Sequence, residues 1–450
     1  MASDRLEIRY GDQLVATIDR NAAQQLSIQY VPDVVSGQVR VPQLTLSLPF
    51  QTDALSNALS HAFLDGLLPE GAVRDTLERR NRIAPGDTFA LLSLIGRDCA
   101  GAFTIMPPID DRAVEHGAVQ WLSEEELSKK IADLPEQPLA VDPAAGIRLS
   151  LGGAQSKMAV VVGPDGIIGL PVGTIPSTHI LKPAILTEDE RRRRRSQLMY
   201  PASVQNEAFC MRLAAKAGVS AAVIEVRMIG GAPALLVDRY DRQREGRLVR
   251  RLHQEDFCQA LGVHPNQKYD VRVAPNFERM AAVLRGHSSR VAADLDHLVD
   301  MMGFNYLIGN SDAHGKNFAL LHAPTGLQLA PAYDLLATRV YPRHNVEMAM
   351  TINGMADPRG LKPLHWVKQL EQMQLGARTY RARLADLTDR VLAALPGITR
   401  WAATTGIHSP MIERIVGGIN ERAPILQAVP GVELPTRRVQ APAGGQGLGD

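Results

Sequence analysis

The sequence predicts an α+β fold of two lobes, one rich in strands and one helical, preceded by a small mixed α/β domain. Short apolar runs separated by turn residues, such as KMAVVV, GPDG and IIGLPV, indicate the strand-rich lobe. After Leu252, apolar residues recur at helical spacing, which indicates the helical lobe. At the N-terminus, two apolar runs around a Gly-Asp turn predict a hairpin, and helical patterns follow it.

The same patterns divide the chain into five segments. The first is an N-terminal domain over residues 1–110. A polar, proline-rich stretch over 111–143, which contains SEEELSKK, is predicted as a linker with a short helix. The strand-rich lobe covers 144–245 and the helical lobe 246–428. Residues 429–450 are rich in Pro and Gly and are predicted to be disordered.

Composition excludes several classes of protein. With 49 Lys and Arg against 48 Asp and Glu, the net charge of +1 argues against a dedicated nucleic-acid binder. The charged N-terminus does not resemble a signal peptide, and no apolar run approaches a membrane span, so we expect a cytoplasmic protein. Three widely spaced cysteines suggest neither a disulfide framework nor a metal site, and we expect them to be buried: Cys99, Cys210 and Cys258.

The stretch NYLIGNSDAHGKNF, residues 305–318, carries the strongest chemical signal. It continues from an apolar helical pattern that Gly309 can end, so its polar groups lie in a short loop. Asp312 and Asn317 are five positions apart, the interval at which protein-kinase catalytic loops place a base and a metal-binding amide. Asp312 would accept a proton from an incoming hydroxyl, and Lys316 would stabilise a transferring phosphate. The alternative is a polar loop that only caps a helix.

A second candidate metal ligand, Asp334, lies in LAPAYDLLA, 22 residues after Asp312. Two short apolar runs around APTG separate the two aspartates, which indicates a hairpin. Kinases place a metal-binding Asp after their catalytic loop in this way. Together with Asn317, Asp334 would hold Mg²⁺, which prefers a few protein oxygens in addition to phosphate oxygens.

A lysine and a glutamate among the predicted strands form a candidate phosphate-binding pair. Lys182 ends the strand THILK, and Glu207 lies in SVQNEAF, on the one helix predicted between the strands. Kinases pair a strand lysine with the α- and β-phosphates of ATP and orient it with a helix glutamate. The alternative is that both are ordinary surface residues.

Two further segments are candidates for nucleotide binding. SLGGAQSK, residues 150–157, is a glycine-rich turn between strands, and its backbone N–H groups can approach phosphates closely. It matches neither the Walker pattern nor G-x-G-x-x-G, so an ordinary β-turn is the alternative. The strand LLVDRY lies where a hinge would bind adenine, which makes Asp238 and Tyr240 candidates for that contact.

In this order the motifs resemble those of one family. SLGGAQSK, HILK, NEAF, VDRYDR, RLHQEDFCQALG, IGNSDAHGKNF and LAPAYDLL are similar to segments of HipA-type serine/threonine kinases. GLLPEG and IGRDCAGA resemble motifs of that family's N-terminal domain, so the resemblance extends over roughly residues 5–425. It implies a bilobal protein-kinase-like fold with an added N-terminal domain.

The resemblance also implies an activity and the residues that perform it. The expected activity is ATP- and Mg²⁺-dependent serine/threonine phosphorylation by the toxin of a type II toxin–antitoxin pair. Asp312 would be the base, Lys182 would hold phosphate, and Asn317 with Asp334 would hold Mg²⁺. The phosphate loop would be lined by Gly152, Gly153, Ala154, Gln155, Ser156 and Lys157. Ser150 is the expected site of inactivating autophosphorylation, because a phosphate there adds negative charge beside ATP.

The implied partners are a HipB-like helix-turn-helix antitoxin, DNA bound mainly through that antitoxin, and a protein substrate such as an aminoacyl-tRNA synthetase. Two alternatives stay open: a catalytically weak pseudokinase that acts as a corepressor with such an antitoxin, and a small-molecule kinase. The family does not account for the run Arg191–Arg195, which is either a solvated loop or a site for an anionic partner such as tRNA.

Overall fold

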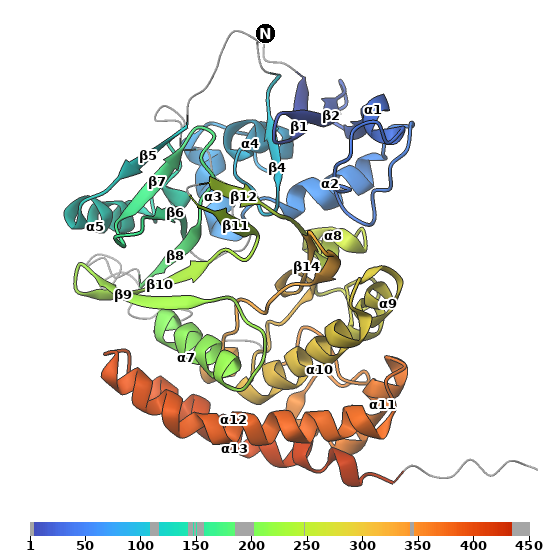
Figure 1. Cartoon of the computed structure of the whole chain (residues 1–450), viewed down its shortest axis with the longest axis vertical. Helices are drawn as coiled ribbons and strands as arrows, with labels where there is room; N and C mark the ends of the chain where they lie inside the picture. Colours follow the sequence, from blue (N-terminus) through green and yellow to red (C-terminus); the bar gives the residue numbers. More distant parts are fainter. Residues whose placement is uncertain are drawn as a thin grey trace, which may run out of the picture.

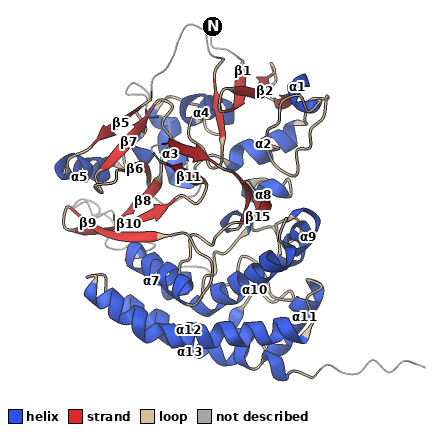
Figure 2. Cartoon of the chain, in the orientation of Figure 1, coloured by secondary structure: helices blue, strands red, loops and turns tan. Residues whose placement is uncertain are grey.

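The computed structural model describes residues 4–108, 117–142, 147, 150, 157–184, 202–246, 248–342 and 346–433. An N-terminal domain lies at the top of Figure 1, a strand-rich lobe in the middle and a helical lobe at the bottom. Figure 2 shows most of the strands in the upper two parts and the longest helices below them. This arrangement agrees with the predicted α+β class and with the predicted order of the lobes.

The N-terminal domain packs helices against a four-stranded antiparallel sheet of order β3-β2-β1-β4. Its strands are β1 (Arg5–Tyr10), β2 (Gln13–Arg20), β3 (Leu26–Tyr30) and β4 (Phe103–Met106). Its helices are α1 (Pro32–Val35), α2 (Asn57–Gly66), α3 (Gly71–Arg80) and α4 (Thr88–Ile95). The predicted hairpin is confirmed, because β1 pairs with β2 around Gly11, whose φ is 57°.

The strand-rich lobe is a six-stranded sheet of order β5-β7-β6-β8-β10-β9. Its strands are β5 (Ala118–Trp121), β6 (Met158–Val162), β7 (Ile168–Val172), β8 (His179–Pro183), β9 (Ile224–Ile229) and β10 (Ala232–Asp238), with a small ribbon of β11 (Arg242–Glu245) and β12 (Leu248–Arg251). Its helices are α5 (Glu124–Asp133), the 3₁₀ turn η1 (Pro138–Ala140) and α7 (Ser203–Lys216).

The range predicted as a linker belongs in part to this sheet. β5 pairs antiparallel with β7, and α5 is the short helix that the sequence predicted. The polar composition of the range concealed the strand, because β5 lies at the edge of the sheet and most of its residues are exposed. In α5, the buried residue is Leu127.

The sheet has two apolar faces because side chains alternate along its strands. On β10, Ala234 and Leu236 pack into one core with the N-terminal domain. Leu235 and Val237 point the other way, into the core that α7 shares with the helical lobe. The N-terminal domain and the strand-rich lobe therefore share one core.

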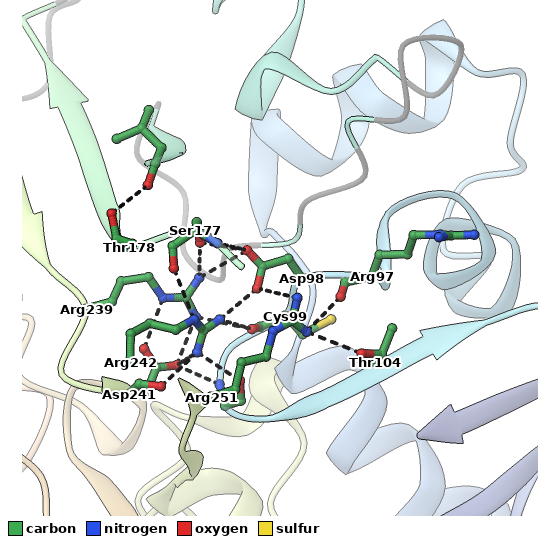
Figure 3. Close-up of polar contacts among 12 residues, drawn as sticks. Arg97, Asp98, Cys99, Thr104, Ser177, Thr178, Arg239, Asp241, Arg242 and Arg251 are labelled. Atoms are coloured by element: carbon green, nitrogen blue, oxygen red, sulfur yellow. Dashed lines mark hydrogen bonds and ion pairs between the residues drawn. The ribbon is translucent and has the colours of Figure 1, made fainter. Parts of the chain in front are cut away.

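Buried charges reinforce the contact between these two parts (Figure 3). Asp98, which lies in the IGRDCAGA motif and is 2 % exposed, accepts a hydrogen bond from Nη2 of Arg242 at 2.7 Å. Its other carboxylate oxygen accepts hydrogen bonds from the amide and hydroxyl of Ser177. The backbone amide of Gly101, in the same motif, donates a hydrogen bond to the carboxylate of Asp241. A Cβ at this glycine would lie 2.8 Å from Nδ1 of His253. The motif is therefore an anchor for the N-terminal domain.

The helical lobe is built around α10 (Val291–Ile308), which Gly309 ends at a φ of 72° as predicted. The other helices are α8 (Phe257–Ala260), α9 (Phe277–His287), α11 (Pro363–Gln372), α12 (Arg378–Thr404) and α13 (Pro410–Gln427). A three-stranded sheet joins β13 (His253–Asp256), β14 (Ala319–Ala323) and β15 (Gly326–Leu329). The 3₁₀ turns of this lobe are η2 (Pro265–Gln267), η3 (Gly315–Asn317), η4 (Thr338–Val340), η5 (Pro358–Gly360) and η6 (Val429–Gly431). The hairpin β14–β15 and the helical stripes of α10 and α12 were predicted correctly.

Two smaller predictions have different outcomes, and two others concern residues that the structure does not describe. The three cysteines are buried, as expected. The disordered tail was predicted to begin too early, because η6 forms a turn and Val429 is fully buried against the helical lobe. The residues of the glycine-rich turn from 151 to 156 and the arginine run 191–195 lie outside the described residues.

None of the helices that the structure describes is long and apolar enough to cross a membrane.

Candidate active site

A cavity of about 930 Å³ lies between the strand-rich and helical lobes, and all three parts of the chain line it. Every described candidate for catalysis, ATP binding or metal binding contributes to its wall: Lys157, Lys182, Glu207, Asp238, Tyr240, Asp312, Lys316, Asn317 and Asp334. The N-terminal domain adds Gly66, Glu70 and Ala100. The volume is within the range of about 300–1,000 Å³ that is usual for sites that bind small ligands.

Lys182 forms the centre of a buried ion-pair cluster. Leu181 beside it faces the core shared with the N-terminal domain, so strand alternation directs Lys182 to the opposite face, toward α7. Its ammonium donates to Oε1 of Glu207 at 2.7 Å and also to Oδ1 of Asp334. Burial disfavours its charge, but the carboxylates of Asp334 and Glu207 outweigh burial and raise the pKa of Lys182. Lys182 therefore stays charged at neutral pH.

Asp334 is held in a conformation that few residues other than glycine adopt. Its φ is 52°, in the left-handed region, which costs on the order of 1–3 kcal/mol and is concentrated at functional sites. Burial opposes ionisation of this carboxyl, but the ammonium groups of Lys182 and Lys157 lower the pKa of Asp334 to about 2. The carboxylate is thus ionised at neutral pH and lines the cavity.

Lys157 follows the glycine-rich turn and is 5 % exposed. Burial lowers the pKa of this lysine to about 8, so a bound anion would favour its charged form. Lys157 and Lys182 together place two cationic groups on one side of the cavity, where phosphates of a nucleotide would find charge partners.

The loop after α10 is ordered by its own polar groups. The side chain of Asn310 accepts a hydrogen bond from the amide of Asp312 at 3.1 Å and donates one to Asn305. The amide of His314 donates both to the carbonyl of Asp312 at 2.9 Å and to Oδ1 of Asn317 at 3.2 Å. These contacts place the carboxylate of Asp312 and the amide side chain of Asn317 on the same cavity wall.

Lys316 lies on the cavity wall, but its ammonium already has partners. It donates to the carbonyl of Gly66 at 3.0 Å and lies 3.2 Å from Oε1 of Glu70 and 3.7 Å from Asp256. Burial opposes the charge of Glu70, but Lys316 and Lys268 lower the pKa of this carboxyl to about 2. A contact between Lys316 and a transferring phosphate would have to compete with these acceptors. That contact stays a prediction.

Asp238 is the last residue of β10, Tyr240 lies two residues beyond it, and both line the cavity. The amide of Asp238 already donates to the carbonyl of Val223 at 2.8 Å, so this geometry does not favour adenine binding through that amide. The ring of Tyr240 lies 5.7 Å from that of Tyr333 and offers an apolar wall. The adenine contact also stays a prediction.

Two cavity residues were missed by the sequence argument. Glu70 lies in GLLPEG, a motif that the sequence related to the N-terminal domain without a chemical role, and it reaches Lys316 and Lys268. Tyr269 donates a hydrogen bond to the candidate base Asp312. Its only signal in the sequence is an aromatic residue within the polar stretch NQKYD, which predicts nothing by itself.

Comparisons with known proteins agree with this fold. The chain is 36 % identical over 390 residues to "Putative kinase Y4mE" of Sinorhizobium fredii, covering 85 % of this chain and 89 % of that protein. It is 29 % identical over 405 residues to the serine/threonine-protein kinase toxin HipA of Shewanella oneidensis, covering 87 % and 88 %. A solved structure of Shewanella oneidensis HipA with HipB and operator DNA has a TM-score of 0.78 and 25 % identity, covering 95 % of this chain and 100 % of that one.

Fold, site and relatives together define the protein as a kinase. Two family models match it, the HipA N-terminal domain over residues 6–106 and the HipA-like C-terminal domain over residues 149–395. The chain belongs to the HipA family, which includes a named serine/threonine-protein kinase toxin.

Proposed function

We propose that the protein transfers the γ-phosphate of ATP to serine or threonine in a protein substrate, with Asp312 as the base. The observation that carries the proposal is the convergence of Lys182, Asp312 and Asp334 on one cavity, although they come from three separate segments. Asp312 would orient the acceptor hydroxyl and accept its proton. Lys157 and Lys182 would bind the phosphates by charge.

The residues present fit Mg²⁺ as the metal. Asp334 offers an ionised carboxylate and Asn317 an amide oxygen, and both line the cavity, which suits an ion that takes one or two protein oxygens together with phosphate oxygens. When bound, Mg²⁺ would neutralise the charge of the phosphates. Glu207 would act by orienting Lys182, since their side chains already meet at 2.7 Å.

We also propose that the protein is the toxin of a type II toxin–antitoxin pair and that it arrests growth by phosphorylating a translation protein such as an aminoacyl-tRNA synthetase. The family supports the toxin assignment, and the solved Shewanella oneidensis complex of HipA, HipB and operator DNA supports a HipB-like antitoxin. A net charge of +1 is compatible with DNA contact made mainly through that antitoxin.

The test is incubation of the purified protein with labelled ATP and Mg²⁺, alone and with a bacterial lysate. We expect label on the protein itself and on a lysate protein, and neither with Asp312→Asn, because the amide cannot accept the proton. Label that persists in Asp312→Asn would contradict the proposal. ATP binding without any Asp312-dependent labelling would favour a corepressor instead, and turnover only with a metabolite pool would indicate a small-molecule kinase.

Ser150 is proposed as the site of inactivating autophosphorylation. In this structure it is fully buried, and its hydroxyl donates to the carbonyl of Leu67 at 2.6 Å. Phosphorylation therefore requires this hydrogen bond to open first. A phosphate on Ser150 would not fit back into the buried position, so the modified segment would stay displaced.

We expect Ser150→Ala to retain its kinase rate during prolonged incubation with ATP while the wild type loses it. The alanine has no acceptor hydroxyl, and leaving the buried carbonyl of Leu67 without its donor costs about 1–3 kcal/mol of stability. Residual labelling rate and intact mass, followed over time, measure the effect. Ser128→Ala on α5 is the matched control and should inactivate like the wild type. Equal loss of activity in Ser150→Ala would refute the role of this serine.

A further inference from the structure

The hydroxyl of Tyr269 donates a hydrogen bond to Oδ1 of Asp312 at 2.7 Å. Tyr269 lies between η2 and α9, lines the cavity and is 52 % exposed. An acceptor serine or threonine must present its hydroxyl proton to this same carboxylate. The tyrosine hydroxyl therefore already occupies Oδ1, one of the two carboxylate oxygens of Asp312 that could accept the acceptor's proton.

Two neighbours hold the ring at this position, and a third residue holds one of them. The ring of His314 meets it edge to face at 5.3 Å, and burial lowers the pKa of His314 to about 4, so that ring is neutral. The ammonium of Lys268 lies 5.4 Å from the centre of the Tyr269 ring, within the range of a cation–π contact. Lys268 is in turn paired with Glu70 of the N-terminal domain. The contact on Asp312 is thus supported by a chain of contacts that begins in the N-terminal domain.

The segment that carries Tyr269 is only lightly packed. Val271 is 79 % exposed and lines the cavity, and Val273 is 36 % exposed. A tyrosine with a purely structural role would bury its ring, whereas this one leaves half of its surface in solvent and directs its hydroxyl to the base. Displacing Tyr269 exposes little additional apolar surface, but it breaks the hydrogen bond to Asp312 and the ring contacts with His314 and Lys268.

We propose that Tyr269 competes with the acceptor for Asp312 and so restricts phosphotransfer to acceptors that can displace it. The proposal rests on the kinase function proposed above. A protein segment can displace Tyr269 because it gains contacts with the exposed side chains of the same loop, whereas water gains none. In the transfer itself, the bond from the acceptor oxygen to the γ-phosphorus forms, the bond to the bridging oxygen of ADP breaks, and the proton passes to Asp312.

The test uses Mg-ATP, no added protein acceptor and chains that all carry Ser150→Ala, so that neither a substrate nor the proposed autophosphorylation site competes with water. The measured quantity is ADP formed by the full chain. We expect Tyr269→Phe to raise the rate about tenfold at unchanged KM for ATP. Tenfold corresponds to about 1.4 kcal/mol, the scale of one net hydrogen bond to a charged group. Phenylalanine keeps the ring contacts with His314 and Lys268 and removes the hydroxyl alone.

Two controls separate this effect from a structural one. Tyr10→Phe removes a hydroxyl from β1, where the ring packs on Phe103, and should leave ADP formation unchanged. In Tyr269→Phe combined with Asp312→Asn, the gain should disappear, because it depends on access to the base.

Three outcomes would overturn the proposal. A rate in Tyr269→Phe equal to or below that of the wild type, with turnover still dependent on Asp312, rejects the competition alone. No ADP from Tyr269→Phe while lysate proteins are labelled in an Asp312-dependent manner rejects it as well. Absence of any Asp312-dependent turnover or labelling rejects the kinase proposal and the competition together.

Discussion

Lys182→Met is expected to reduce ATP-dependent phosphotransfer by about 10²–10³-fold, the effect of removing one preorganised charge from a transition-state site. Methionine preserves the length of the side chain but cannot pair with phosphate. It also leaves the buried carboxylates of Glu207 and Asp334 without the ammonium that both contact. We therefore expect weaker ATP binding together with a slower reaction.

The measurement is the initial rate of labelling at saturating ATP, with ATP affinity determined separately by titration. Lys368→Met on α11 is the matched control, because this lysine is exposed and lies outside the cavity lining. It should retain the wild-type rate. A rate for Lys182→Met within a factor of about three of the wild type would exclude Lys182 from the phosphate site.

Asp98→Asn is expected to lower the free energy of unfolding by about 3–5 kcal/mol, the range for removing one partner of a buried ion pair. The side chain of Asp98 is 3 % exposed and pairs with Arg242 at 2.7 Å, Arg251 at 3.4 Å and Arg239 at 3.7 Å. Asparagine keeps the shape but leaves Arg239 and Arg242 with Asp241 as their remaining carboxylate in the cluster (Figure 3). Among the described residues, Arg251 keeps only its hydrogen bonds to the carbonyl of Arg97 and the hydroxyl of Thr104. Denaturation by guanidinium chloride, followed by fluorescence and circular dichroism, measures the change.

The pH dependence of the lost unfolding free energy tests whether the ionised carboxylate of Asp98 is its cause. Burial opposes the charge of Asp98, but the three arginines hold the pKa of this carboxyl well below its usual range. A carboxyl with a lowered native pKa stabilises the fold above its unfolded pKa of about 3.9 and loses that contribution as the pH falls toward the native pKa. The difference between wild type and Asp98→Asn should therefore be full at neutral pH and narrow below about pH 4.

Asp19→Asn is the matched control, because Asp19 forms a surface ion pair with Arg5 at 2.6 Å in which both side chains are at least one-third exposed. Such a pair contributes less than about 1 kcal/mol. Equal destabilisation by the two substitutions would show that the Asp98 cluster does not anchor the N-terminal domain.

Local patterns predicted those parts of the fold that depend on neighbouring residues in the chain. The hairpin β1–β2, the turn between β6 and β7, and the end of α10 at Gly309 all follow from turn residues and apolar periodicity. The linker prediction failed at β5, because an edge strand with exposed residues has no apolar alternation to detect.

Where candidate site residues lie on one segment, their spacing in the sequence was enough to predict that they act together. Asp312 and Asn317 share one loop, so their interval in the sequence directly indicates their joint position. Lys182 and Glu207 were paired only by analogy with the order of kinase elements, and their contact at 2.7 Å is a product of strand β8 facing α7.

The sequence by itself determined the α+β class, the order of the lobes and the residue types available for phosphotransfer, because turns, periodicity and motifs are local properties. Only the tertiary structure decided that Glu70 of the N-terminal domain reaches Lys316 and Lys268, and that Tyr269 lies on Asp312. Those contacts join residues that are far apart in the chain. The contacts of Glu70 depend on how the shared core orients the N-terminal domain over the cavity, and the contact of Tyr269 depends on how the loop before α9 packs against the loop after α10. No local pattern encodes either arrangement.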